Sequence, residues 1–126
     1  MKTKLNILIT AGGTREYIDP VRFISNASSG KMGYALARAA INAGHKVTLI
    51  NANTLCSKPK TATLIKVFTS DDMFKAVKAE FEKCDCLIMA AAVSDYKPAR
   101  SSKTKIKKEQ SVLSLNLKPT KDILKW

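Results

Sequence analysis

The chain has 126 residues, 45% of them hydrophobic, and a formal net charge of +12 at pH 7. This length predicts one domain, and the apolar share is sufficient for a hydrophobic core. No apolar run is long enough to cross a bilayer, and the N-terminal MKTKLNILIT lacks a signal-peptide cleavage pattern, so we expect a cytoplasmic protein that does not engage a membrane.

The positive charge is concentrated in the last quarter of the chain. From Lys97 to Trp126 there are nine Lys or Arg residues and two acidic residues, Glu109 and Asp122, a surplus of seven. Such a field attracts polyanions, either a nucleic acid or a triphosphate with a phosphorylated substrate. Single-strand binders interleave aromatic residues with basic ones for base stacking, and this segment lacks that pattern. Nucleic acid is therefore the less favoured partner.

The first elements in chain order are a strand, a long loop and a helix. Leu5–Thr10 is a short apolar run that leads into glycines, which predicts a buried parallel strand. Residues 11–29 form a long polar loop. An alanine-rich helix is predicted from about Lys31 to Ala43, and Gly44 ends it.

The next elements repeat this alternation. Strands are predicted over Lys46–Ile50, Thr63–Phe68 and Cys86–Val93. Before the last of them, Thr69 and Asp72 form a capping-box pattern that begins a helix. Strand–helix alternation predicts an α/β fold, a Rossmann-like parallel sheet with flanking helices, as one domain over residues 1–126. Ligands of such sheets bind at the carboxyl ends of the strands, so the candidate sites are the loops 11–29 and 90–100.

Beyond Pro98 the pattern changes. Residues 99–111 are polar and basic without periodicity, which predicts a flexible loop, and Val112–Lys118 alternates as a half-exposed strand does. Residues 118–126 indicate a turn that leads into a helix, with nothing after Trp126 to complete it. We therefore expect the domain to be truncated at its C-terminus.

The segment Ser28–Gly33, SSGKMG, begins the first helix. Exposed amides at a helix N-terminus bind phosphate, and the hydroxyls and Lys31 add donors and charge. The alternative is a helix cap with two packing glycines, and the Walker A pattern is absent. A dinucleotide is disfavoured, because the tight turn after the first strand is missing and the second strand ends in Asn51 instead of an acid.

Four further features leave alternatives open. Asn26 either orients an acyl group or is a turn residue, and Asp95 either binds a ribose hydroxyl or a metal ion or is an ordinary turn aspartate. Lys105–Lys108, KIKK, is either a lid that closes over a triphosphate or a solvated charge run. TREYIDPVR holds Arg15, Glu16, Asp19 and Arg22, which are close enough to pair among themselves, and position alone does not distinguish surface ion pairs from a functional cluster.

Taken together, TAGGTREYIDPVRFISNASSGKMGYALA, AAAVSDYKP, KIKK and LNLKPTKDIL resemble the motifs of the phosphopantothenoylcysteine synthetase family, in the same order. The sequence looks like the bacterial, CTP-using type. The resemblance implies a ligase of coenzyme A biosynthesis that joins 4′-phosphopantothenate to L-cysteine through an acyl-cytidylate, with CTP as co-substrate and Mg²⁺. It also implies a homodimer, with the basic loop and the following strand forming a dimerisation arm.

The resemblance also assigns roles to residues. It implies that Asn26 and Lys105 are catalytic, Asn26 acting on the acyl-cytidylate and Lys105 engaging the triphosphate. It places Asn26, Ala27 and Arg22 at the substrate. It places the following residues at the nucleotide, with Asp95 also a candidate Mg²⁺ ligand: Gly12, Ser28, Ser29, Gly30, Lys31, Ala91, Ala92, Val93, Asp95, Lys105, Lys108 and Asp122.

Overall fold

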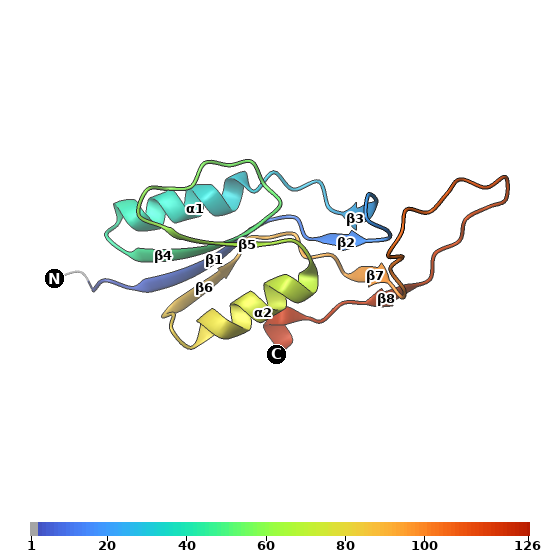
Figure 1. Cartoon of the computed structure of the whole chain (residues 1–126). Helices are drawn as coiled ribbons and strands as arrows, with labels where there is room; N and C mark the ends of the chain where they lie inside the picture. Colours follow the sequence, from blue (N-terminus) through green and yellow to red (C-terminus); the bar gives the residue numbers. More distant parts are fainter. Residues whose placement is uncertain (1–2) are drawn as a thin grey trace.

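The centre of the protein is a four-stranded parallel sheet, and the computed structural model describes residues 3–126 (Figure 1). The strand order is β5-β4-β1-β6. The four strands are β1 (Asn6–Gly12), β4 (Lys46–Ala52), β5 (Thr63–Val67) and β6 (Cys86–Met89). β1 lies between its neighbours, so that Ile9 pairs with Leu49 on one side and Ile88 on the other. The predicted Rossmann-like α/β fold is confirmed.

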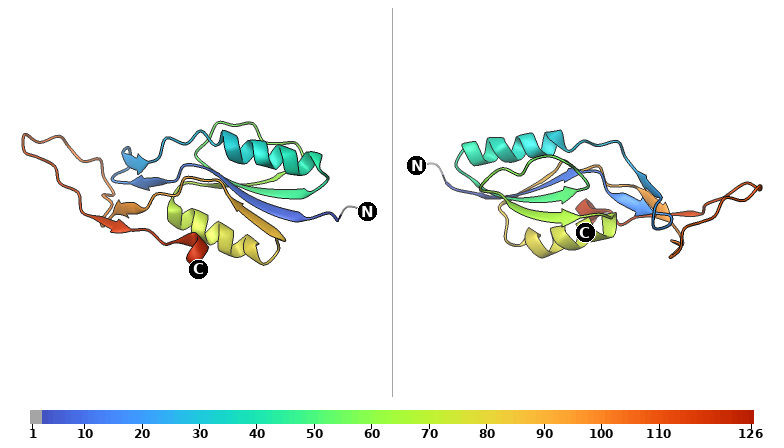
Figure 2. Two further views of the ribbon diagram at one scale, coloured as in Figure 1. Left: turned by 180° about the vertical axis from the view of Figure 1, so that it is seen from behind. Right: turned by 45° about the horizontal axis from the view of Figure 1, so that its top comes forward.

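One helix covers each face of the sheet, α1 (Lys31–Asn42) above and α2 (Ser70–Phe81) below in Figure 1, and Figure 2 shows the same layers from behind. Successive strand residues point to opposite faces. Ile9 therefore belongs with Tyr34 to the core between the sheet and α1, while Leu8 belongs with Met73 to the core between the sheet and α2. Among residues 3–126, neither helix is long and apolar enough to span a bilayer.

The start of α2 follows its sequence signal. The Thr69 hydroxyl accepts a hydrogen bond from the Asp72 amide at 3.1 Å, and the Asp72 carboxylate accepts one from the Thr69 amide at 3.1 Å. This reciprocal pair is the predicted capping box, which satisfies two amides that the helix itself leaves unpaired.

The long loop after β1 contains a hairpin that the sequence pattern did not reveal. β2 (Arg15–Tyr17) pairs antiparallel with β3 (Phe23–Ser25). The rings of Tyr17 and Phe23 meet edge to face at 5.6 Å, and the Arg15 guanidinium lies 4.4 Å from the centre of the Phe23 ring. Each strand has three residues, which is too short for an alternating pattern to be recognised.

Residues 99–116 form an arm that projects away from the sheet between β7 (Tyr96–Pro98) and β8 (Leu117–Pro119) (Figures 1 and 2). The strand predicted over Val112–Lys118 is wrong for residues 112–116, since only Leu117 and Lys118 belong to β8. The reason is the length of the partner: β7 has three residues, and its antiparallel ladder with β8 ends at Leu117. Val112 is consequently 90% exposed.

We expect the core beneath α1 to dominate the stability of the fold. Leu49 is fully buried there, so Leu49→Ala should lower the free energy of unfolding by about 2–5 kcal/mol, measured by urea denaturation. Leu55 is fully exposed, and the same truncation there is the matched control, with an expected change within about 0.5 kcal/mol. Equal effects of the two substitutions would show that Leu49 is not in a packed core.

Candidate functional site

The two loops that the sequence marked as candidate sites meet at Gly13, just past the end of β1. The Ala92 amide donates to the Gly12 carbonyl at 2.7 Å, and the Thr14 amide donates to the Ala92 carbonyl at 3.1 Å. A side-chain carbon on Gly13 would lie 2.9 Å from the Asn26 carbonyl oxygen, closer than real contacts allow. Glycine at this position therefore lets the Asn26 segment lie against the same stretch of backbone that pairs with Ala92.

The predicted phosphate cradle lies at the N-terminus of α1. Ser28, Ser29 and Lys31 line a cleft of about 580 Å³ together with residues 53–57, which follow β4. Gly30 adopts φ 80°, and a side-chain carbon there would lie 2.5 Å from the Thr54 methyl group. The first turn of α1 carries no acidic residue, so its positive dipole end is not neutralised by the helix itself. This geometry suits an anion.

A second pocket, of about 420 Å³, brings Asp95 and Asp122 together although they are far apart in the sequence. Ala91 and Val93 also line it. The Thr120 amide donates to the Asp95 carbonyl at 2.9 Å, which extends the pairing of β7 with β8 and carries Asp122 to this place. Ala92 does not line this pocket; its amide donates to Gly12 at the end of β1, and its carbonyl accepts from Thr14 just past that end.

Only two carboxylates line this pocket, and residues 3–126 contain no cluster of three or more acidic, His or Cys side chains able to hold a metal ion. Mg²⁺ is commonly held by one or two carboxylates plus substrate phosphates, and not by an all-protein cage. Asp95 and Asp122 therefore fit a magnesium ion that arrives with a nucleotide.

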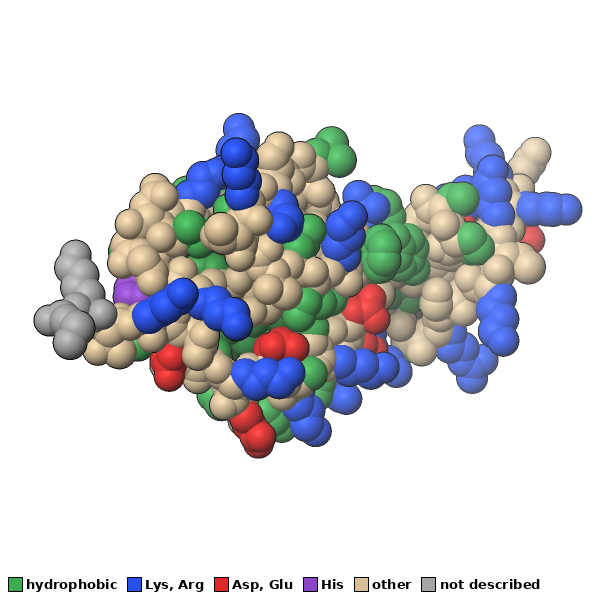
Figure 3. Space-filling view, turned by 60° about the vertical axis from the view of Figure 1, so that its left-hand side comes forward, with side chains coloured by type: hydrophobic (Ala, Val, Ile, Leu, Met, Phe, Trp, Pro, Cys, Tyr) green, Lys and Arg blue, Asp and Glu red, His purple; other side chains and the backbone are tan. Residues whose placement is uncertain are grey.

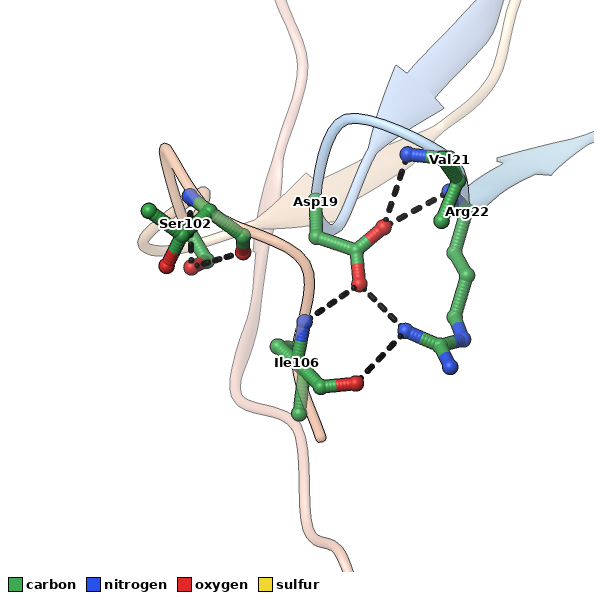
Figure 4. A network of polar contacts seen from close by, with 6 residues as sticks. Asp19, Val21, Arg22, Ser102 and Ile106 are labelled. Carbon is green, nitrogen blue, oxygen red and sulfur yellow. Dashed lines mark hydrogen bonds and ion pairs between the residues drawn. The ribbon is translucent and has the colours of Figure 1, made fainter. Parts of the chain in front are cut away.

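The base of the arm packs on the hairpin through Asp19, Arg22 and Ile106 (Figure 4). Asp19 is 1% exposed, and its carboxylate accepts hydrogen bonds from three backbone amides and from the Arg22 guanidinium. Burial raises the pKa of Asp19, but the hydrogen bonds from Ile106, Val21 and Arg22 outweigh it and lower this pKa to about 2. The carboxylate is therefore ionised at neutral pH.

Positive charge predominates at this base. Arg22, Lys107 and Lys108 line a pocket of about 470 Å³ with Ile106 and one acidic residue, Glu109, and Figure 3 shows further Lys and Arg side chains along the arm. Lys105 is exposed and lines neither this pocket nor that of Asp95. The predicted site residues that line pockets thus fall into three groups, at the cleft beside α1, in the Asp95–Asp122 pocket and at the base of the arm.

Two acidic residues of the hairpin are buried and join separate elements, whereas the surface ion pairs considered from the sequence would leave them exposed. Asp19 is buried, and so is Glu16, whose carboxylate accepts from the Ser70 amide at 3.2 Å and from the Ser70 hydroxyl at 2.8 Å. Glu16 thereby fixes the hairpin to the N-terminus of α2. Asp19 precedes Pro20, a turn signal that was available in the sequence; the inward orientation of Glu16 carries no comparable signal.

The end of β4 is also occupied by a structural contact. Asn51 is buried, and its side-chain carbonyl accepts hydrogen bonds from the Tyr34 hydroxyl at 2.9 Å and the Thr54 hydroxyl at 2.5 Å. This position, where a dinucleotide-binding fold places an acid for the ribose, here joins β4 to α1.

The chain is similar to known proteins over nearly all of its length. Residues 2–126 match the model of the DNA/pantothenate metabolism flavoprotein C-terminal domain. The chain is 46% identical over 121 residues to the coenzyme A biosynthesis bifunctional protein CoaBC of Bacillus subtilis (strain 168), covering 95% of this chain and 30% of that protein.

Solved structures of the same kind superpose well. A crystal structure of the C-terminal domain of a CoaBC protein has a TM-score of 0.81 and 41% identity, covering 98% of this chain and 57% of that one. The DNA/pantothenate metabolism flavoprotein from Streptococcus pneumoniae has a TM-score of 0.83 and 30% identity, with coverage of 95% and 62%. The chain thus spans less than two thirds of these relatives. The match over nearly all of its length confirms the resemblance noted in its motifs, and the chain belongs to the family of the DNA/pantothenate metabolism flavoprotein C-terminal domain.

Proposed function

We propose that this chain forms the activating part of a ligase that joins 4′-phosphopantothenate to L-cysteine in coenzyme A biosynthesis, with CTP as co-substrate. The observation that carries the proposal is the meeting of three regions at Gly13: the Asn26 segment, the α1 cleft and the segment that leads to Asp95. An activating reaction needs an acyl-binding group beside a nucleotide site, and these regions would supply both. The names of the CoaBC relatives support the same assignment.

The proposed chemistry has two steps. A carboxylate oxygen of 4′-phosphopantothenate attacks the α-phosphorus of CTP, the bond to the β-phosphate oxygen breaks, and pyrophosphate leaves. The cysteine amine then attacks the acyl carbon of the resulting acyl-cytidylate, loses a proton and expels CMP. The protein needs mainly to position these groups and to stabilise developing charge.

Each region contributes to one of these requirements. The hydroxyls of Ser28 and Ser29 and the Lys31 side chain would cradle phosphate oxygens, together with the backbone amides at the N-cap residue Gly30. Asp95 and Asp122 would bind the nucleoside and hold Mg²⁺, which when bound neutralises phosphate charge. Asn26, with Ala27 beside it, would meet the acyl group, a role that its exposure and the position of its backbone next to Gly13 support.

The second half-reaction should depend on the amide of Asn26. Asn26→Asp keeps the shape but replaces an NH₂ donor by a negative oxygen, which repels the developing oxyanion. We expect normal pyrophosphate release from CTP and phosphopantothenate, with amide formation reduced by about 100-fold or more. Asn42→Asp, at the exposed end of α1, is the matched control. Normal amide formation by Asn26→Asp would reject this role.

The first half-reaction should depend on the charge of Lys105. Lys105→Gln removes charge-assisted contacts to the triphosphate, so we expect pyrophosphate release before cysteine addition to slow on the order of 10- to 100-fold. Lys103→Gln, another exposed lysine of the same arm, should have a much smaller effect. If Lys105→Gln fails only after cysteine is added, Lys105 acts in the other step.

The arm further supports a homodimer. Val112, Leu113 and Leu115 are exposed at 90%, 64% and 41%, and a second copy of the chain is the partner we propose for them. Light scattering at micromolar concentration should give a dimer mass, and Leu113→Glu combined with Leu115→Glu should shift it to the monomer. A monomer mass without substitution would count against the dimer.

A further inference from the structure

The buried carboxylate of Asp19 joins two parts of the chain that are far apart in sequence. Its Oδ1 accepts from the Val21 amide at 2.9 Å and the Arg22 amide at 2.8 Å, which closes the turn of its own hairpin. Its Oδ2 accepts from the Ile106 amide, on the arm, at 3.1 Å and from the Arg22 guanidinium. Figure 4 shows the four donors converging on this one side chain.

Arg22 of the hairpin adds a second hydrogen bond to Ile106 of the arm. Arg22 Nη1 donates to the Ile106 carbonyl at 3.1 Å, so the arginine binds Asp19 and Ile106 together. A second tie lies nearby, where the Ser102 amide donates to the Ile18 carbonyl at 2.8 Å. The backbone on both sides of Lys105 is thereby fixed to the hairpin, although the Lys105 side chain is exposed.

The composition of the arm shows why these contacts of Asp19 with Ile106 and Arg22, here called the latch, are needed. Ile106 is the sole apolar residue among the lysines of residues 103–108, and four like charges in this short stretch repel one another. The segment cannot offset its ordering entropy by burial. The ionised carboxylate of Asp19 accepts a hydrogen bond from the Ile106 amide, and Arg22 joins the same carboxylate to the Ile106 carbonyl. These charge-assisted contacts hold this part of the arm in one position.

We propose that Asp19 is a positioning residue: by holding Ile106 and Arg22 on one carboxylate, it sets where Lys105 meets the triphosphate. This rests on the proposed function, because it assumes that Lys105 acts on the nucleotide. Asp19 itself is buried and its contacts are all within the chain, so its proposed part is to position other groups.

Asp19→Asn in the intact protein tests the latch. The amide oxygen can still close the turn, while its NH₂ group faces the Ile106 amide and the Arg22 guanidinium, both of them donors. Pyrophosphate release before cysteine addition should slow on the order of 10- to 100-fold. Amide formation from intermediate that has already accumulated should keep its rate. Hydrogen exchange should accelerate in residues 103–109 but not in β1 or α1. An unchanged first half-reaction overturns the proposal.

A double-mutant cycle separates positioning from general damage. If Asp19 acts through Lys105, Asp19→Asn combined with Lys105→Gln should be no slower than Lys105→Gln alone. Fold-losses that multiply would overturn the proposal. A normal Lys105→Gln enzyme would instead reject the role of Lys105 and the latch with it, whereas a defective Lys105→Gln beside a normal Asp19→Asn rejects the latch only.

If Asp19→Asn does not fold, a substitution on the arm tests the same contact. Ile106→Pro removes the amide that Asp19 accepts and leaves the hairpin and the core intact. It should slow pyrophosphate release as Asp19→Asn does. Gln110→Pro is the matched control, since Gln110 is exposed on the same arm and its amide makes no hydrogen bond within residues 3–126. Equal rates for the two proline variants overturn the proposal.

Discussion

The arrangement of the site depends on the hydrogen bonds that continue from β1 after the regular strand has ended. Gly13 and Thr14 bond to Ala52 and Ala92, so the backbone of the first loop is held between the ends of two neighbouring strands. A strand that ended at Gly12 without these bonds would leave the Asn26 and Ala92 segments free to separate. Because the backbone is fixed here and Gly13 has no side chain, both segments lie against the same peptide groups.

A loop of this length can be ordered only if its buried backbone groups find partners, and side chains supply many of them. Glu16 accepts from the first residue of α2, Asp19 accepts from its own turn and from the arm, and the Asn53 amide donates to the carbonyls of Gly13 and Phe68, both at 2.9 Å. Each of these side chains joins two elements. The loop thus becomes a rigid platform through polar contacts, with little contribution from a hydrophobic core of its own.

The sheet and its helices were predictable because their signals are local. The apolar run of β1 and the capping box of Thr69 and Asp72 each lie within a few residues, and both appear as expected. The hairpin was not predictable in this way, because its strands are short and its carboxylates act on residues 54 and 87 positions away. Asn26, Asp95 and Lys105–Lys108 were candidates from the residues alone, but their roles came from the resemblance of whole motifs. No spacing rule would have placed Asp95 in the same pocket as Asp122.

The arm shows the limit of periodicity most clearly. Alternating apolar residues predict a strand, but a strand forms only where a partner backbone accepts its hydrogen bonds, and β7 offers three residues. Residues 112–115 therefore have the alternating sequence of a strand but do not form one. Their apolar side chains remain exposed beside a run of lysines. Lysine charge opposes close association of two such arms unless anions or acidic groups intervene. If the proposed phosphorylated substrates bind at the base of the arm, they would lessen that repulsion, and substrate binding and the proposed association of the arms would then favour one another.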